Sequence, residues 1–203
     1  MASTGKVFTD AFWKNNPILL QVLGICSTLA VTNLLANTLF MCFGLIFTTG
    51  LSSFTISALR NLIPDRIRMI VQVLIISVYV MMVDIIIKAV NPDIHNFIGP
   101  YVGLIITNCI VMGRAEAFAA QNKPVISFVD GIAMGMGYSM ILILIALVRE
   151  PLGFGTILGY KLPGLEHWWH QWTIMVMAPG AFFMLAVFTW IARARMSSLK
   201  GTK

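Results

Sequence analysis

The sequence predicts an all-α integral membrane protein with six transmembrane helices. Three observations support this prediction: hydrophobic residues make up 58% of the 203 residues, charged residues make up only 11%, and six apolar stretches approach the length of a membrane span. A soluble domain carries about 25% charged residues, and a globule of this size needs a polar surface that this composition cannot supply. The composition therefore excludes a soluble enzyme, a disordered chain and a nucleic-acid-binding module, and it makes a lipid bilayer the expected surroundings.

Each helix that crosses a bilayer needs about 20 apolar residues. Proline and polar residues separate the six stretches, and the connecting segments are too short to fold alone. We therefore expect residues 1–203 to form a single membrane domain, without a separate nucleotide or flavin domain. The six expected spans are Pro17–Ala36, Asn37–Leu59, Ile67–Ile87, Ile98–Met112, Phe128–Val148 and Trp172–Ile191.

The 14 basic residues are unevenly divided between the two sides of these spans. Cytoplasmic segments of membrane proteins carry an excess of Lys and Arg. The richer side also holds both ends of a six-span chain, so we expect both termini in the cytoplasm. The richer side has Lys6, Lys14, Arg60, Arg66, Arg68, Arg114, Lys123, Arg193, Arg195, Lys200 and Lys203, and the poorer side has Lys88, Arg149 and Lys161.

The first three spans and the last three share landmarks. Pro17 lies nine residues before Cys26, and Pro100 lies nine residues before Cys109. A later span of each half ends in similar residues, Ala58–Asn61 in one and Leu147–Glu150 in the other. Because three is an odd number, a second copy enters the membrane from the opposite side. We therefore expect two inverted three-helix repeats, at about residues 15–90 and about residues 98–192.

Both landmark cysteines are expected near the middle of the bilayer. Nine residues of α-helix rise about 13.5 Å, which is close to half the hydrocarbon thickness. Gly24 and Ser27-Thr28 flank Cys26, and Thr107-Asn108 precedes Cys109. Small and polar residues can satisfy backbone groups that a local unwinding frees. We therefore expect the first and fourth helices to be broken near the midplane, with the two thiols meeting there.

Three interpretations of these thiols remain open. A lone Cys in a membrane helix is usually an inert apolar filler, and this is the expectation for Cys42. A disulfide would explain a pair of cysteines but not their depth. Matching positions favour a metal site at Cys26 and Cys109, since thiolates bind iron–sulfur clusters. A [2Fe–2S] cluster usually takes four cysteines, so the other two would come from a partner chain.

Two carboxylates and a pair of glycines are further candidates for a functional or packing role. Asp84 has Lys88 four residues further on, which is typical of a helical ion pair, and Asp130 lies near a helix start, where the helix dipole favours an anion. The functional alternative for both is a cation pathway, because ionisable groups at membrane depth often mark one. Gly131 and Gly135 predict close helix packing, inside the protein or against a partner. No nucleophile–base arrangement is visible, so no catalytic residue is expected.

Several blocks of this sequence resemble one membrane-protein family. They are Asn15–Cys26, Gly103–Ala119, Ser127–Gly131 and Arg149-Glu150. Together they are similar to the D-type subunits of sodium-translocating NADH:quinone reductases. The block around Cys109 also occurs in the related E-type subunits of Rnf complexes, which are ferredoxin:NAD oxidoreductases.

The resemblance implies a particular role in electron transfer. It implies a homologous E-type partner of inverted orientation, and an intramembrane cluster bound by Cys26, Cys109 and two cysteines of that partner. NADH, FAD, FMN and quinone would bind to other subunits of a complex in the bacterial inner membrane. The expected function is electron relay coupled to Na⁺ transport. The alternatives are an Rnf-type subunit, a self-contained secondary transporter with inverted repeats, and a scaffold with inert thiols.

Overall fold

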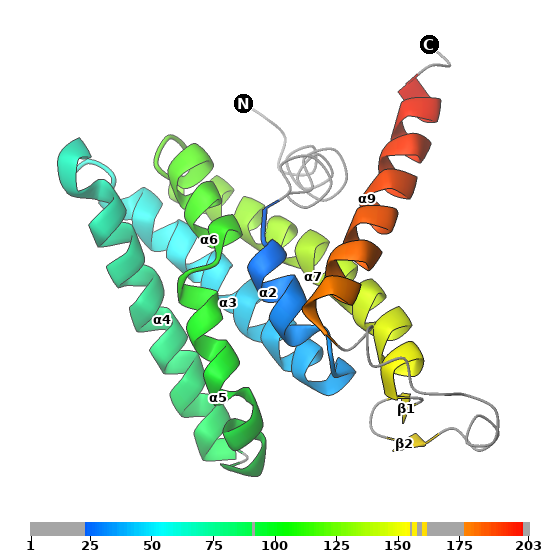
Figure 1. The fold of residues 1–203 in the computed structure, drawn as a ribbon. Coiled ribbons are helices and arrows are strands. Elements are labelled where there is room, and N and C mark those ends of the chain that lie inside the picture. The colour runs from blue at the N-terminus through cyan, green and yellow to red at the C-terminus, as the bar shows by residue number, and fades with distance from the viewer. Residues whose placement is uncertain (1–22, 91, 155, 158–159, 162–176, 201–203) are drawn as a thin grey trace.

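The computed structural model shows a bundle of long helices (Figure 1). It describes residues 23–90, 92–154, 156–157, 160–161 and 177–200. The prediction of an all-α membrane fold is confirmed, with only a short hairpin, β1 and β2, among the described strands. The elements are α2 (Ile25–Val31), α3 (Leu35–Leu59), η3 (Asp65–Ile67), α4 (Arg68–Val90), α5 (Pro92–Ile106), α6 (Cys109–Arg114), η4 (Ala115–Ala119), α7 (Pro124–Phe154), β1 (Thr156–Ile157), β2 (Tyr160–Lys161) and α9 (Ala178–Lys200).

Four described helical stretches are long and apolar enough to cross a membrane. A fifth apolar helix, Pro179–Ala194, is shorter. It coincides with the sixth expected span, whose first residues lie outside the described part. Only the second half of the first expected span is described, as α2. The four long stretches are Leu35–Leu59, Arg68–Ala89, Gly99–Ala119 and Pro124–Gly153.

Two expected boundaries in the first and fourth spans are wrong. The first span ends earlier than Ala36, because α2 stops at Val31 and α3 already begins at Leu35. The fourth span runs past Met112, since the π-helix η4 continues α6 as far as Ala119. A π-turn uses i to i+5 hydrogen bonds, here from the Ala120 amide to the Ala115 carbonyl at 3.0 Å. Sequence patterns carry no signal for such a turn.

The expected end of the fifth span at Val148 is also wrong. Helix α7 continues through Arg149, Glu150 and Pro151 to Phe154. Arg149 and Glu150 are 2% and 1% exposed, although Arg149 was expected among the basic residues outside the membrane spans. Both side chains have hydrogen-bond partners inside the bundle. A paired charge does not have to leave the bundle, so these charges do not end the helix.

Helices α3 and α7 pack closely along their length and form the centre of the bundle. A Cβ atom added to Gly131 would lie 2.8 Å from the backbone oxygen of Thr49, and one added to Gly135 would lie 3.0 Å from the Cα of Ile46. This confirms the close packing expected of these two glycines and places it inside the protein. Phe54 and Phe128 meet edge to face in the same interface, with ring centroids 6.3 Å apart.

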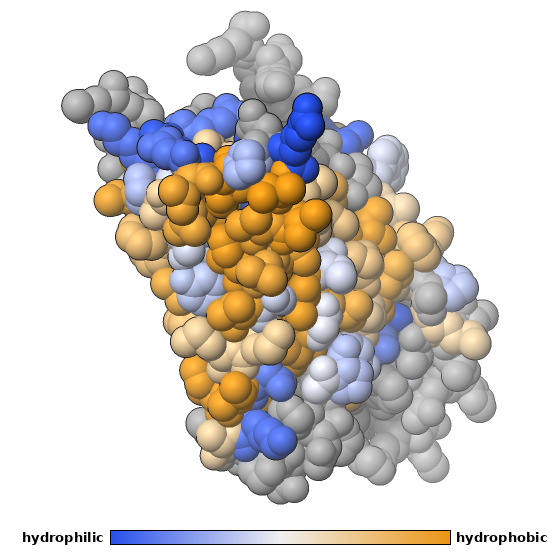
Figure 2. All heavy atoms as spheres, turned by 90° about the vertical axis from the view of Figure 1, so that its left-hand side faces the viewer, coloured by the Kyte–Doolittle hydropathy of each residue, from blue (hydrophilic) through white to orange (hydrophobic). Residues whose placement is uncertain are grey.

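Helix α4 presents one apolar face outward, while Ile76, Val80 and Val83 are buried in the core. Figure 2 shows this side of the molecule as a hydrophobic band with hydrophilic side chains gathered above it and at its lower edge. Hydrocarbon solvates such a band, whereas water does not. Its exposed α4 members include Met69, Ile70, Leu74, Val78, Met81, Met82, Ile85 and Ile86.

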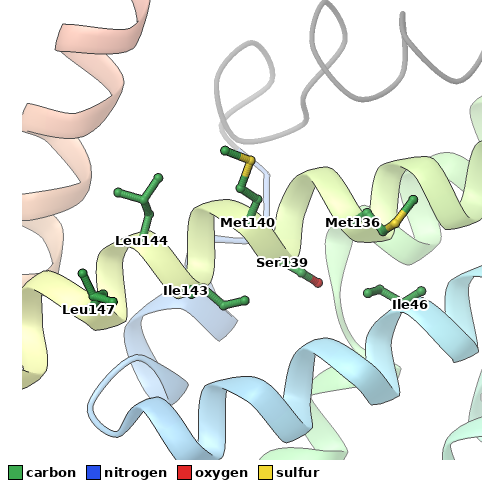
Figure 3. A pocket seen from close by; sticks show the side chains of 7 residues that line it. All are labelled: Ile46, Met136, Ser139, Met140, Ile143, Leu144 and Leu147. Carbon is green, nitrogen blue, oxygen red and sulfur yellow. The ribbon is translucent and has the colours of Figure 1, made fainter. Parts of the chain in front are cut away.

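An open groove of about 400 Å³ lies along α7 beside α3 (Figure 3). Ser139 and Ile143 point from α7 toward α3, whereas Met140 and Leu144 point away. The Ser139 hydroxyl has no hydrogen-bond partner in the described part of the chain, and no lining residue is charged. This groove suits hydrocarbon and not a cation or a nucleotide. The lining residues are Ile46, Met136, Ser139, Met140, Ile143, Leu144 and Leu147.

We predict that Gly131→Ala destabilises the bundle by about 1–3 kcal/mol, because the added methyl group meets backbone atoms that cannot move aside. Gly103→Ala is the matched control, since a Cβ there meets nothing within 4 Å. That change should be neutral or stabilise by up to about 1 kcal/mol through helix propensity. The measurement is the unfolding midpoint of the purified chain in detergent. Equal effects of the two changes would contradict the close packing of α3 on α7.

Candidate metal centre

The fourth membrane helix is interrupted between α5 and α6. Helix α5 ends at Ile106, and α6 begins at Cys109. Asn108 has an extended backbone, and its side-chain oxygen accepts a hydrogen bond of 3.0 Å from the Ile110 amide. An Asn at this N-cap position satisfies an amide that a helix start leaves unpaired. The expected break before Cys109 is therefore present.

Non-helical residues also precede α2, and these residues and those before α6 are the two helix breaks. Gly24 has a left-handed backbone with φ of 79°, and α2 begins at the next residue. A Cβ atom at Gly24 would lie 2.6 Å from Cδ1 of Ile110 and 2.9 Å from Cε2 of Tyr138. Only glycine combines this backbone angle with such close neighbours. The part of the expected first helix before this point lies outside the described residues.

The two landmark cysteines occupy the first turns of the helices that follow these breaks. Cys26 is the second residue of α2, and Cys109 is the first residue of α6. Their neighbours Ser27 and Asn108 are hydrogen-bonded at 3.2 Å, and the two thiols lie close enough to interact electrostatically. Both are free and exposed, whereas Cys42 is free and buried. The structure thus brings together the two thiols that were paired from the sequence and leaves Cys42 in the hydrophobic core.

These two thiols fit half of a four-cysteine ligand set. Among the described residues, no three His, Cys, Asp or Glu side chains are grouped as a metal site would need. A [2Fe–2S] cluster usually takes four thiolates. Because Cys26 and Cys109 are adjacent and exposed, another chain can approach them with the missing ligands. The donor set of this chain is therefore compatible with a shared cluster and is insufficient for a cluster of its own.

A buried polar network lies behind the thiols. The Tyr138 hydroxyl, on α7, donates to the Gly24 carbonyl at 2.9 Å and also contacts the Ser27 hydroxyl. The Ser27 hydroxyl in turn accepts a hydrogen bond of 3.2 Å from the side-chain amide of Asn108. Tyr138 was not predicted as a site residue. No spacing rule connects Ser27 and Tyr138, which lie 111 positions apart.

Asp130 forms an ion pair with Arg114. The Arg114 Nε donates to one carboxylate oxygen at 2.9 Å, and Nη2 contacts the other. The side chains of Asp130 and Arg114 are only 3% and 13% exposed. Asp130 lies beyond the first turn of α7, which contains no acidic residue. Its partner is therefore a guanidinium group from the segment that follows Cys109, and this pairing was not foreseen.

Asp84 lies in a different environment. It is half-buried on α4 and lines an open pocket of about 350 Å³ between α4 and α5. The pocket is otherwise apolar and includes Gly99 and Gly103. Asp84 and Asp130 thus belong to different helix contacts, and the structure gives them no common ligand set among the described residues.

Arg149 and Glu150 stabilise the turn between α2 and α3. Arg149 donates to the Leu29 carbonyl at 3.3 Å and to the Thr32 hydroxyl at 2.8 Å, at the end of α2. Glu150 accepts a hydrogen bond of 2.8 Å from the Leu35 amide, at the start of α3. A cation at a helix C-terminus and an anion at an N-terminus both match the helix dipole.

Arg60 makes the corresponding contact at the opposite end of α3. It donates to the carbonyls of Gln121 and Asn122 at 3.1 Å and 3.0 Å, just beyond the end of η4. Arg60 is the counterpart of Arg149 in the expected repeat. In the structure each arginine contacts the end of the cysteine-bearing helical segment of the other half. The landmark residues therefore form reciprocal contacts.

The fold and these contacts define an integral membrane protein with paired thiols at two helix breaks. A family model described as "Rnf-Nqr subunit, membrane protein" matches residues 4–189. The chain belongs to this Rnf-Nqr family of membrane subunits.

The chain is also similar to several curated proteins, each named as the D-type subunit of a Na⁺-translocating NADH-quinone reductase. One from Chlamydia trachomatis is 45% identical over 192 residues, covering 91% of this chain and 90% of the relative. One from Psychromonas ingrahamii is 46% identical, covering 92% and 90%. One from Pseudoalteromonas translucida is 45% identical, covering 88% and 87%.

We predict that Asp130→Asn destabilises the chain by about 3–5 kcal/mol, because it leaves the Arg114 charge buried without a counter-charge. The matched control is Glu116→Gln, which removes the carboxylate of the Arg68–Glu116 pair, whose side chains are 35% and 34% exposed. The control should cost about 1 kcal/mol or less. SDS-induced unfolding in detergent measures both changes. A loss at Asp130 no larger than the loss at Glu116 would contradict a structural role for the buried pair.

Proposed function

We propose that this chain is a membrane subunit of a sodium-translocating NADH:quinone oxidoreductase and that it relays electrons between the two sides of the bilayer. The relatives at 45–46% identity over nearly the full chain carry the name of that complex. This naming favours the quinone reductase over an Rnf-type complex. The observation that carries the relay function is the placement of Cys26 and Cys109 side by side at the protein surface, next to the hydrogen-bonded pair Ser27 and Asn108.

In this proposal Cys26 and Cys109 provide two of the four ligands of a [2Fe–2S] cluster. A homologous E-type subunit, inserted in the opposite orientation, provides the other two. When bound, such a cluster supplies one-electron transfer. The contribution of this chain is to hold two thiols side by side at helix breaks whose backbone groups are satisfied by Asn108 and by the Ser27–Tyr138 network.

The other redox groups of the complex belong elsewhere. We assign NADH, FAD, FMN and quinone to other subunits of the complex, as the similarity to D-type subunits of NADH-quinone reductases implies. The proposed location is the bacterial inner membrane, with both termini in the cytoplasm. The basic residues Arg60, Arg66, Arg68 and Lys123, which lie at or beyond the ends of the described spans, support this orientation through the excess of positive charge on cytoplasmic segments.

The proposed architecture is a pair of inverted repeats, at about residues 15–90 and about residues 98–192. Two observations support it. Each cysteine follows a helix break, and Arg60 and Arg149 make reciprocal contacts at the ends of the segments that carry Cys109 and Cys26. An axis in the membrane plane relates such repeats and places their common site near the midplane.

A cation pathway past Asp84 and Asp130 is the second part of the proposal. Asp84 lines an open pocket between two membrane helices, and a carboxylate at such a place is a suitable ligand for Na⁺. Asp130 is already paired with Arg114. A sodium ion at Asp130 would therefore have to replace the guanidinium group as the counter-charge.

The relay function predicts that Cys26→Ala and Cys109→Ala each remove one [2Fe–2S] cluster from the assembled complex. The reason is that either change leaves too few thiolates to hold the cluster. Iron and acid-labile sulfide analysis, together with the electron paramagnetic resonance signal of the reduced complex, measures this loss. Electron transfer from NADH to quinone should fall by at least two orders of magnitude.

Cys42→Ala is the matched control, because Cys42 is a buried thiol on a neighbouring helix. It should leave iron content and turnover unchanged. Unaltered iron content in both the Cys26 and Cys109 variants would overturn the proposal and leave the scaffold alternative. Na⁺ flux by this chain reconstituted alone would instead favour a self-contained transporter.

The cation pathway predicts that Asp84→Asn raises the Na⁺ concentration for half-maximal quinone reduction by about tenfold, since the loss of one carboxylate ligand weakens cation binding. Asp84→Glu keeps the charge and should shift this concentration by less. The measurement is turnover of the complex against Na⁺ at constant ionic strength. An identical Na⁺ dependence in wild type and Asp84→Asn would exclude Asp84 from the pathway.

A further inference from the structure

The Tyr138 hydroxyl occupies a central position between the two helix breaks. Tyr138 is completely buried on α7. Its hydroxyl contacts three groups of the first break: the Gly24 carbonyl at 2.9 Å, the Ser27 hydroxyl, and the Thr28 hydroxyl at 3.4 Å. A single phenol therefore fixes the start of α2 against α7.

The same hydroxyl is connected to the second break. The Ser27 hydroxyl accepts a hydrogen bond of 3.2 Å from the side-chain amide of Asn108, although the two residues are 81 positions apart. The Asn108 side-chain oxygen then accepts from the Ile110 amide at 3.0 Å, which fixes the start of α6. Ser27 immediately follows Cys26, and Asn108 immediately precedes Cys109. The Ser27–Asn108 hydrogen bond thus joins the two residues that flank the thiols, and Tyr138 holds Ser27 against α7.

We propose that Tyr138 is a positioning residue that fixes the separation of the Cys26 and Cys109 thiols, because its hydroxyl holds Ser27, and through Ser27 also Asn108, against α7. This inference deepens the proposed function, since it concerns the same pair of thiols. No covalent bond joins α2 to α6 at this point, because both cysteines are free. Their relative position depends on non-covalent contacts, and this network is the hydrogen-bonded connection between the two breaks among the described residues.

Removal of the hydroxyl should loosen the thiol pair without unfolding the chain. In Tyr138→Phe, the Gly24 carbonyl still accepts from the Thr28 hydroxyl at 2.9 Å and from the Ser27 hydroxyl at 3.2 Å. The ring itself keeps its place against Gly24. What is lost is the hydroxyl that attaches the first break directly, and the second break through Ser27, to the middle of α7. The variant therefore separates positioning from folding.

The test uses phenylarsine oxide, which binds tightly only to two thiols held close together. The protein is the full chain in detergent, reduced and carrying Cys42→Ala, so that Cys26 and Cys109 are its only thiols. We expect one arsenical per chain, and an affinity about tenfold lower in Tyr138→Phe, as the loss of one buried hydrogen bond predicts. This readout needs neither iron nor a partner subunit.

Tyr79→Phe is the matched control. Tyr79 also shares its hydroxyl with a hydroxyl of a neighbouring helix, that of Thr55 at 2.6 Å, but it lies between α3 and α4. Its arsenical affinity should equal that of the parent chain. Ser27→Ala is a second test variant, because it interrupts the same network and keeps the phenol. Its arsenical affinity should also be lower than that of the parent chain, and it provides the test of the network if Tyr138→Phe does not fold.

A parallel measurement in the assembled complex separates the two proposals. There Tyr138→Phe should retain its iron and shift the midpoint potential and the resonance spectrum of the cluster, whereas Tyr79→Phe should change neither. Unchanged arsenical affinity in a folded Tyr138→Phe variant would overturn the positioning role of Tyr138, whatever the effect of Ser27→Ala, and unchanged affinity in Ser27→Ala would overturn it if Tyr138→Phe does not fold. A lowered affinity combined with a wild-type complex that contains no [2Fe–2S] cluster would support the positioning role and overturn the relay function.

Discussion

Hydrocarbon cannot hydrogen-bond to a backbone, so a membrane helix can be interrupted only where protein groups replace the lost bonds. This chain has such an interruption before Cys109, and a second non-helical break lies before Ile25 at the start of the described residues. At the break before Ile25, the Gly24 carbonyl accepts hydrogen bonds from hydroxyl groups of α2 and α7. At the break before Cys109, Asn108 provides the N-cap. The thiols lie together because both breaks are satisfied by one shared network, and the rest of the bundle is arranged around it.

Helix α7 connects this network to the two other polar centres of the bundle. Asp130 holds Arg114 near one end of α7, Tyr138 reaches the helix breaks at its middle, and Arg149 with Glu150 stabilises the α2–α3 turn near the other end. The glycines of α7 also bring it against α3 more closely than larger residues would permit. A displacement of α7 would therefore change the positions of the thiols, the Arg114–Asp130 ion pair and the α2–α3 turn at the same time.

Features that depend on neighbouring residues were predictable from the sequence. The pairing of Cys26 and Cys109 followed from their matching distances to a proline, and the packing of Gly131 and Gly135 followed from their spacing. Features that depend on partners far along the chain were not. Arg149 was assigned outside the spans, because its hydrogen-bond partners at Leu29 and Thr32 are about 120 residues away. The Arg114–Asp130 pair and the Tyr138 network were missed because no local pattern marks them.

The π-turn at Ala115–Ala119 has a consequence for the register of this helix. A wide turn accommodates one residue more than an α-helical turn does, so the residues before it are rotated by about 100° relative to an uninterrupted helix. Arg114, which immediately precedes the turn, faces Asp130 in this rotated setting. A variant of this protein with one residue deleted in the π-turn would still form a continuous membrane-spanning α-helix. Its guanidinium group would nevertheless point to a different neighbour, and Asp130 would need another counter-ion.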